Sequence, residues 1–124
     1  MIRQTVPSGV DAIGRARRHV RNGLGTALSS TQVAAAELMT GELVANAVQH
    51  AGLLDGDLIE IDIYVEPTTV RISVVDAGPG LDPDQPILGS NPHGWGLVLV
   101  DRIADRWGIQ RFHPHSVWFE IDRS

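Results

Sequence analysis

A carboxylate, a carboxamide and an imidazole recur at every fourth position in one stretch of the sequence. They belong to Glu42, Asn46 and His50, and this spacing stacks their side chains along one face of an α-helix. All three groups form hydrogen bonds, and the carboxylate and the imidazole also exchange protons. Because the rest of the stretch is largely apolar, the three form a polar stripe. Taken alone, this stripe is explained by a solvent-facing side of the helix, and it becomes a candidate site only together with the residues that follow.

A second candidate group is Asp76, at the end of a predicted strand. The apolar positions of that strand place Asp76 on the same, buried side. They are Val70, Ile72 and Val74. A carboxylate aimed at the core needs a partner, because leaving it unpaired is costly. The partner is either the following turn, which Asp commonly organises before Gly, or a ligand donor such as an adenine amino group. Gly78 and Gly80 permit a ligand to approach the backbone closely.

The third candidate is the segment His-Gly-Trp-Gly at 93–96, which precedes a predicted helix that starts at Leu97. Glycines ahead of a helix leave its first amides free, and these amides with the positive end of the helix dipole form a natural phosphate site. The sequence contains no lysine, so a P-loop lysine is excluded. Phosphates would therefore be held by backbone amides, arginine or a metal ion.

Length and composition limit the classes of protein. The 124 residues have room for one domain, 1–124, which buries about two-thirds of its unfolded surface. No run approaches ~20 apolar residues and the N-terminus lacks a signal-peptide core, so we expect a cytoplasmic protein without a membrane partner. The absence of cysteine excludes disulfides, thiolate catalysis and cysteine-based zinc sites. A net charge of -5 argues against a general nucleic-acid binder.

Two helices are predicted in the first half of the chain, after a frayed start. Residues 8–11 resemble a capping box, and apolar residues recur at helical spacing over 10–28. The inward positions of this first helix are Val10, Ile13, Ala16, Val20, Leu24 and Ala27. Its other faces carry arginines, which we interpret as a solvated surface. Ser29 and Gln32 offer a second cap, for a helix over 33–51 that a glycine ends.

The second half is predicted to be mostly strands. Apolar and polar residues alternate over 59–65 and again over 70–74, so these two strands form an antiparallel hairpin. The rest is interpreted as a long loop, a helix and two strands, at 76–92, 97–106, 107–112 and 117–121. This order predicts an α+β fold, a two-layer α/β sandwich with helices on one face of a mostly antiparallel sheet.

Three motifs in this order and spacing resemble the N, G1 and G2 boxes of the Bergerat-fold (GHKL) ATPases. They are Glu42-Leu-Val-Ala-Asn46-Ala-Val-Gln-His50, Asp76-Ala-Gly78-Pro-Gly80 and Gly94-Trp95-Gly96-Leu97. The combination is far more specific than any one motif, and the resemblance covers about 7–121. Within this superfamily of histidine kinase-like ATPase domains, the short chain is similar to the anti-sigma-factor serine/threonine kinases.

The resemblance implies a role for each box. Glu42 would be the catalytic base that takes a proton from the attacking hydroxyl, and Asn46 would ligate Mg²⁺. Asp76 would recognise the adenine of ATP, and Gly78 and Gly80 would let the base lie flat. Gly94 and Gly96 would surround the phosphates, and 81–92 would be a mobile lid. The remaining implied ATP contacts are His50, Gly78, Gly80, Gly94, Trp95, Gly96, Leu97 and Ser116. Phosphoryl transfer needs mostly positioning and charge neutralisation, which these groups can supply.

The sequence departs from the family pattern at two places. Trp95 stands where relatives often carry a basic residue that contacts the terminal phosphate. His115 precedes Ser116 in the last strand, where relatives usually have Gly-Thr or Gly-Lys-Thr, so the last nucleotide-contacting box is only partly preserved. We interpret His113 and His115 as flanking a proline in a hairpin turn, with no carboxylate cluster nearby that would complete a metal site.

The resemblance implies a protein kinase that phosphorylates an anti-sigma-factor antagonist and, when released from it, sequesters a sigma factor. It implies no direct nucleic-acid contact, and it suggests a homodimer. One alternative is a nucleotide-dependent interaction module with little or no kinase activity, whose lid and first helix bind a partner. Another is the catalytic half of a two-component histidine kinase, which is less expected because a dimerisation helix with a phosphoacceptor histidine is missing from the sequence.

Overall fold

Five strands and three helices make up the described part of the protein. The computed structural model describes residues 1–50, 56–76, 97–110 and 115–124. In chain order the elements are β1 (Ile2–Pro7), α1 (Ala12–Leu24), α2 (Ser30–His50), β2 (Leu58–Val65), β3 (Thr69–Asp76), α3 (Leu97–Ile103), β4 (Arg106–Gln110) and β5 (His115–Asp122). No helix within these ranges is long and apolar enough to cross a bilayer.

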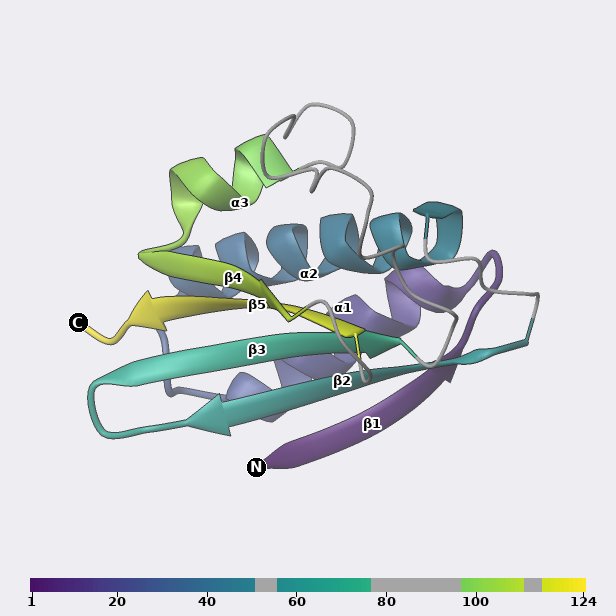
Figure 1. The fold of residues 1–124 in the computed structure, drawn as a ribbon. Coiled ribbons are helices and arrows are strands. Elements are labelled where there is room, and N and C mark those ends of the chain that lie inside the picture. The colour runs from purple at the N-terminus through teal and green to yellow at the C-terminus, as the bar shows by residue number, and fades with distance from the viewer. Residues whose placement is uncertain (51–55, 77–96, 111–114) are drawn as a thin grey trace.

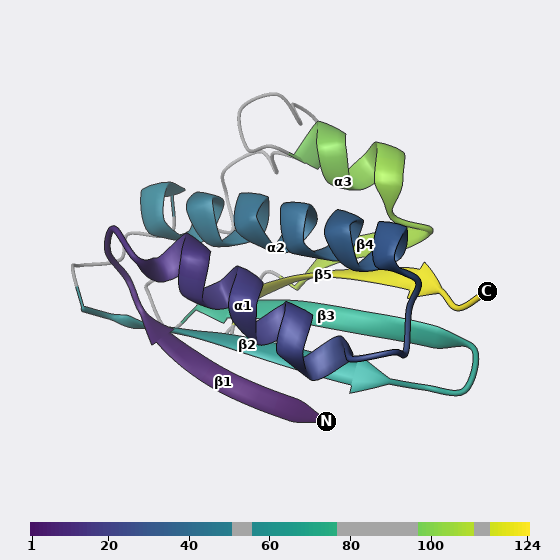
Figure 2. The same ribbon diagram turned by 180° about the vertical axis from the view of Figure 1, so that it is seen from behind.

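The strands form one sheet and the helices form a second layer. The strand order is β1-β2-β3-β5-β4, and every neighbouring pair is antiparallel. Helices α1 and α2 cover one face of this sheet, and α3 packs beside α2 and β4 (Figure 1). The view from behind shows α1 and α2 in front of the strands (Figure 2). The predicted α+β two-layer sandwich is therefore confirmed.

The core lies between the two layers, and the alternation of β2 and β3 explains why. Ile59, Ile61 and Ile63 are completely buried, and they face Asp76, Val74 and Ile72 across the predicted hairpin. Each inward apolar side chain removes area from water, which is the main driving force for docking the helices. The opposite face of the sheet carries the polar residues of the same strands, so one face is packed and the other is open.

The prediction of a frayed N-terminus is wrong, because residues Ile2–Pro7 form the edge strand β1. This strand pairs with β2 along its whole length, and Val6 is fully buried. On the open face Arg3 binds Asp62 of β2 through an Nε–Oδ1 contact of 2.9 Å. The strand buries only this one apolar side chain, so its sequence carries too little alternation to be recognised.

The first helix begins two residues later than predicted. Its buried positions are Ala12, Ala16, His19, Val20 and Leu24, whereas Val10 is fully exposed and Ile13 is 37% exposed. Val10 and Ile13 were predicted to face the core, so this part of the prediction is wrong. The reason is that Ser8 is tied to the backbone of Asp57 and Gly56, which delays the start of the helix. The side chain of Asp11 makes no capping hydrogen bond.

The second helix has the predicted capping box. The amide of Ser29 donates to Gln32 Oε1 and the amide of Gln32 donates to Ser29 Oγ, both at 3.1 Å. Gln32 also donates from Nε2 to the carbonyl of Asp122 at 2.9 Å, which ties the start of α2 to the end of β5. The cap therefore fixes both the first turn of α2 and its place over the sheet.

The C-terminal elements differ from the prediction in their bounds. The helix predicted for 97–106 ends at Ile103, because Asp105 donates its amide to the carbonyl of Glu120 and the chain turns back into the sheet. Arg106 is therefore the first residue of β4 and not the end of a helix. The last strand starts at His115, two residues earlier than predicted, so the interpretation of His115 as a turn residue is wrong.

Candidate functional site

Three elements bring candidate residues to one end of the molecule. Helix α2 reaches this end with its C-terminal turns, β3 ends there at Asp76, and β5 starts there at His115 (Figures 1 and 2). Helix α2 contacts β3, β5 and α3. The sequence pattern had assigned Asn46 and Asp76 to one site, and the fold places the elements that carry them in adjacent layers.

Asp76 is buried on the helix-covered face of the sheet, as its position in the strand predicts. Its side chain is 2% exposed. Across the β3–β5 pair it lies opposite His115, and His115 Nδ1 is 2.7 Å from Asp76 Oδ2. A carboxylate only accepts hydrogen bonds, so Nδ1 is the donor and carries the proton. In the neutral ring Nε2 is then an acceptor, a tautomer that we assign from this hydrogen bond.

This pair leaves two buried atoms without a hydrogen bond. Asp76 Oδ1 and His115 Nε2 have no partner among the residues that the structure describes. A buried polar atom without a partner costs about 1–3 kcal/mol. The end of β3 is therefore an incomplete polar site, and its free carboxylate oxygen fits a ligand that offers a hydrogen-bond donor.

Glu42 and Asn46 line a different side of α2 from the one that packs on α1. On the α1 side, Arg21 Nη2 binds Glu37 Oε1 at 2.7 Å and Arg17 lies against Gly41. At ~100° per residue, Glu42 and Asn46 lie about 100° and 140° around the helix from Gly41.

Both side chains are half-buried and form no hydrogen bond or ion pair with a described residue. A carboxylate and a carboxamide oxygen one helical turn apart are the kinds of ligand that a hard cation such as Mg²⁺ takes. Asn46 therefore offers an oxygen that suits a Mg²⁺–phosphate site, and the carboxylate of Glu42 lies one helical turn away.

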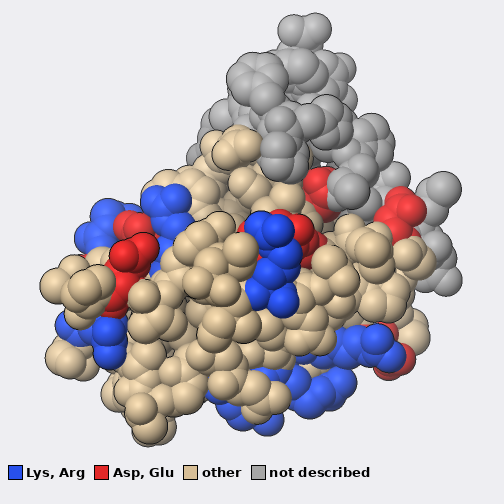
Figure 3. Space-filling model, turned by 90° about the horizontal axis from the view of Figure 1, so that it is seen from below, with Lys and Arg blue, Asp and Glu red and all other residues tan. Residues whose placement is uncertain are grey.

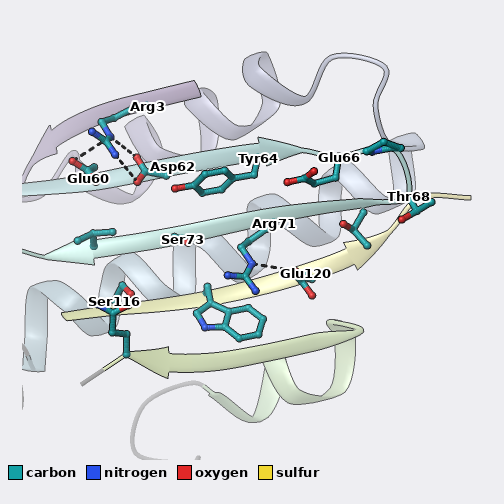
Figure 4. Close-up of a pocket in the computed structure, with 15 residues that line it drawn as sticks. Arg3, Glu60, Asp62, Tyr64, Glu66, Thr68, Arg71, Ser73, Ser116 and Glu120 are labelled. Atoms are coloured by element: carbon teal, nitrogen blue, oxygen red, sulfur yellow. Dashed lines mark hydrogen bonds and ion pairs between the residues drawn. The ribbon is translucent and has the colours of Figure 1, made fainter. Parts of the chain in front are cut away.

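The structure does not bring Ser116 to this site. Successive residues of a strand point to opposite faces, so Ser116 points away from the face that carries His115 and Asp76. It lines a groove on the open face instead (Figure 4). Leu97 begins α3, and the residue as a whole is almost completely buried.

Most of the other predicted contacts lie outside the described residues. His50 is the last residue of α2. The predicted contacts in the glycine motifs and the predicted lid lie outside the described residues. They are Gly78, Gly80, Gly94, Trp95, Gly96 and 81–92.

His115 is the functional candidate that the sequence interpretation missed. Counting back in steps of two from the buried Ile121 and Phe119 gives 117 and 115 as inward positions of the last strand. The same count along β3 gives Asp76 as its last inward residue. The signal was therefore present, but it required knowing that these two strands are neighbours in the sheet.

A groove lies on the opposite, open face of the sheet and has a volume of about 860 Å³. Its charged side chains pair with one another, as the dashed lines in Figure 4 mark for Arg3 and Arg71. Arg3 Nε is 3.3 Å from Glu60 Oε1, and Arg71 Nε is 3.1 Å from Glu120 Oε2. In the view from below, a basic side chain lies against acidic ones in the middle of the surface (Figure 3).

The ion pairs and burial of this face shift two pKa values in opposite directions. The pKa of Glu60 is raised, first by burial and then by its neighbour Asp62. The pKa of Glu120 is lowered, chiefly by its hydrogen bond from Arg106. Glu60 and Glu120 already pair with arginines of the protein. The open face therefore has fewer free hydrogen-bond acceptors for a nucleotide than the site at Asp76, where Oδ1 is unpaired among the described residues.

Comparison with known protein families adds one match. The family model described as the histidine kinase-like ATPase domain matches residues 6–118, which include every candidate residue discussed above. A search of curated proteins returned no match.

Proposed function

The chain belongs to the family of histidine kinase-like ATPase domains, and on this premise we propose that it is an ATP-binding regulatory protein that acts as a serine/threonine protein kinase. Its substrate is an anti-sigma-factor antagonist, and its second partner is a sigma factor that it sequesters in the cytoplasm. The partners come from the similarity of the three motifs to the anti-sigma-factor kinases.

The observation that carries the nucleotide site is the buried carboxylate of Asp76. One oxygen is held by His115 and the other is an unpaired acceptor at the end of β3. The amino group of adenine is a donor of matching chemistry, and it recovers the hydrogen bond that the buried oxygen lacks. A nucleobase with only acceptors at that edge would leave the carboxylate unpaired.

The phosphate end of the site is assigned to α2. Asn46 offers a carboxamide oxygen to Mg²⁺, and the bound ion neutralises charge on the phosphates. Glu42, one helical turn earlier, takes the proton from the attacking hydroxyl of the protein substrate. Neither side chain has a described partner that would compete for these roles.

The test separates binding from phosphoryl transfer. We expect Glu42→Ala to bind ATP and Mg²⁺ like the wild type in calorimetry but to transfer no label from [γ-³²P]ATP to an antagonist protein. Asn46→Ala should lose Mg²⁺-dependent binding. A matched control is Gln49→Ala, which removes an exposed polar side chain from the same helix. Unchanged transfer by Glu42→Ala would overturn the assignment of the base.

A second function is favoured by the position of Ser116. Since Ser116 faces the open side of the sheet, its hydroxyl does not lie on the side that carries Asp76. The alternative is an interaction module that changes partners with ATP or ADP occupancy and transfers no phosphate. Wild-type protein that binds ATP tightly, but leaves every tested antagonist unlabelled, would favour this module over the kinase.

A further inference from the structure

We propose that His115 is a positioning residue for nucleobase recognition: its Nδ1 holds the carboxylate of Asp76 so that Oδ1 accepts a hydrogen bond from the 6-amino group of a purine. The inference rests on the proposed function, because it concerns the same nucleotide site. It assigns a role to a residue at which this chain departs from the Gly-Thr pattern of the family it resembles.

The sheet fixes the relative position of the two side chains. Asp76 and His115 are cross-strand partners in the β3–β5 register, at the last residue of one strand and the first of the other. Both are almost completely buried, and the hydrogen-bonding atoms are 2.7 Å apart. The next inward pair, Val74 and Val117, lies in the same register and packs with the core. The strand register therefore holds the two residues opposite each other at the end of the sheet.

Holding one oxygen of a carboxylate determines where the other oxygen points. A carboxylate with no such contact rotates about its Cβ–Cγ bond, and an Asp before a glycine-containing turn readily bonds to the backbone that follows it. The hydrogen bond from Nδ1 to Oδ2 opposes that rotation. Oδ1 then stays in place as an acceptor before a ligand arrives, so less entropy is lost when the ligand binds.

The pair retains hydrogen-bonding capacity that a ligand can use. A pair that served only to satisfy buried groups would leave few of its own atoms unbonded, because each costs stability. Here Asp76 Oδ1 and His115 Nε2 both remain without a partner among the described residues. The pair is thus arranged to receive a donor from outside, and the 6-amino group of adenine is such a donor.

The experiment measures how much the amino group contributes to binding. The probes are ADP and purine riboside 5′-diphosphate, which is ADP without the amino group, each titrated calorimetrically into the full chain with Mg²⁺. In the wild type we expect ADP to bind about tenfold tighter or more, since a charged acceptor is involved. In His115→Phe, which lacks the donor, this ratio should fall to about threefold or less.

The conservative variant His115→Asn is the rescue control, because its amide nitrogen occupies the same δ position as Nδ1 and also donates. It should keep most of the wild-type ratio. An unchanged ratio in folded His115→Phe would overturn the inference while leaving ATP binding intact. Wild-type protein that binds neither probe would instead refute the proposed function, so the two failures are distinguishable.

A measurement on the wild type covers the case in which His115→Phe does not fold. The ¹⁵N resonances of the ring report its tautomer, and we expect the proton on Nδ1. On addition of ADP the resonances of His115 should shift more than on addition of purine riboside 5′-diphosphate. A proton on Nε2, or equal shifts with both probes, would contradict the inference.

Discussion

Replacing Asp76 by Asn should weaken nucleotide binding more than the loss of one charge suggests. His115 donates from Nδ1 to Oδ2, so the carbonyl oxygen of Asn is drawn to that position. The amide NH₂ group then stands where Oδ1 was, and it faces the amino group of adenine. An acceptor is thereby replaced by a donor in a buried site.

The magnitude follows from the value of a hydrogen bond to a charged acceptor. Losing about 1.5–3 kcal/mol corresponds to a Kd that is roughly 10- to 150-fold higher. At an ADP concentration of 100 times the wild-type Kd, binding stabilises the wild type by about 2.7 kcal/mol. A Kd raised by about 30-fold leaves roughly 0.9 kcal/mol of this stabilisation in Asp76→Asn.

The assay is thermal unfolding with and without ADP and Mg²⁺. One kcal/mol moves the Tm of a domain of this size by roughly 3–6 °C, so the ADP-induced rise should fall by about 5 °C or more in Asp76→Asn. The matched control is Asp62→Asn, the same change at a carboxylate that is also buried but lies on the open face. An undiminished rise in Asp76→Asn, or an equal loss in Asp62→Asn, would refute the reasoning.

Two further predictions concern the sheet. Gly108→Ala should destabilise the fold by about 1–3 kcal/mol, because its Cβ would lie 2.7 Å from the ring of Trp118. Gly14→Ala in α1 should instead stabilise by about 0.5–1 kcal/mol, because its Cβ would only touch the end of the Arg18 side chain, at 3.6 Å. Equal effects of the two substitutions in urea unfolding would contradict this. Arg106 lowers the pKa of Glu120 in the folded protein below the value of 4.5 that the residue has in the unfolded chain. The ionised carboxylate therefore adds to the free energy of unfolding above pH 4.5, and this contribution is lost as the pH falls below that value. The difference in free energy of unfolding between wild type and Glu120→Gln should therefore be larger at pH 7 than at pH 3. A difference that does not change with pH would contradict the lowered pKa of Glu120.

The long helix and the central hairpin could be predicted because local signals and tertiary packing agree there. Ser29 and Gln32 cap α2 through their own side chains, which is a purely local interaction. The isoleucines of β2 are all buried as their alternation predicts, although Asp62 is buried as well and Val65 is exposed. In such segments the sequence pattern and the final environment carry the same information.

The edge strand and the start of α1 could not be predicted because distant partners decide them. Residues Ile2–Pro7 bury one apolar side chain and become a strand only by pairing with β2. Val10 looks like part of an apolar stripe, yet the backbone bonds of Ser8 to Asp57 and Gly56 delay the helix until Ala12. Neither contact leaves a periodic signal in the sequence.

The sequence was enough to predict the buried carboxylate of the candidate site, but not the residue that binds it. The buried side of Asp76 follows from strand parity, whereas its partner His115 depends on β5 lying next to β3. Parity also separates Ser116 from this face, although the resemblance to the family had grouped it with the nucleotide contacts. A motif thus identifies candidate residues, but the sheet order decides which of them meet.

The most direct test of the nucleotide site is a crystal structure of the protein grown with Mg²⁺ and a non-hydrolysable ATP analogue. We predict that the adenine amino group lies within hydrogen-bonding distance of Asp76 Oδ1 and that Asn46 contacts the metal ion. A nucleotide bound in the groove on the open face, or one that leaves Asp76 Oδ1 unpaired, would contradict the account.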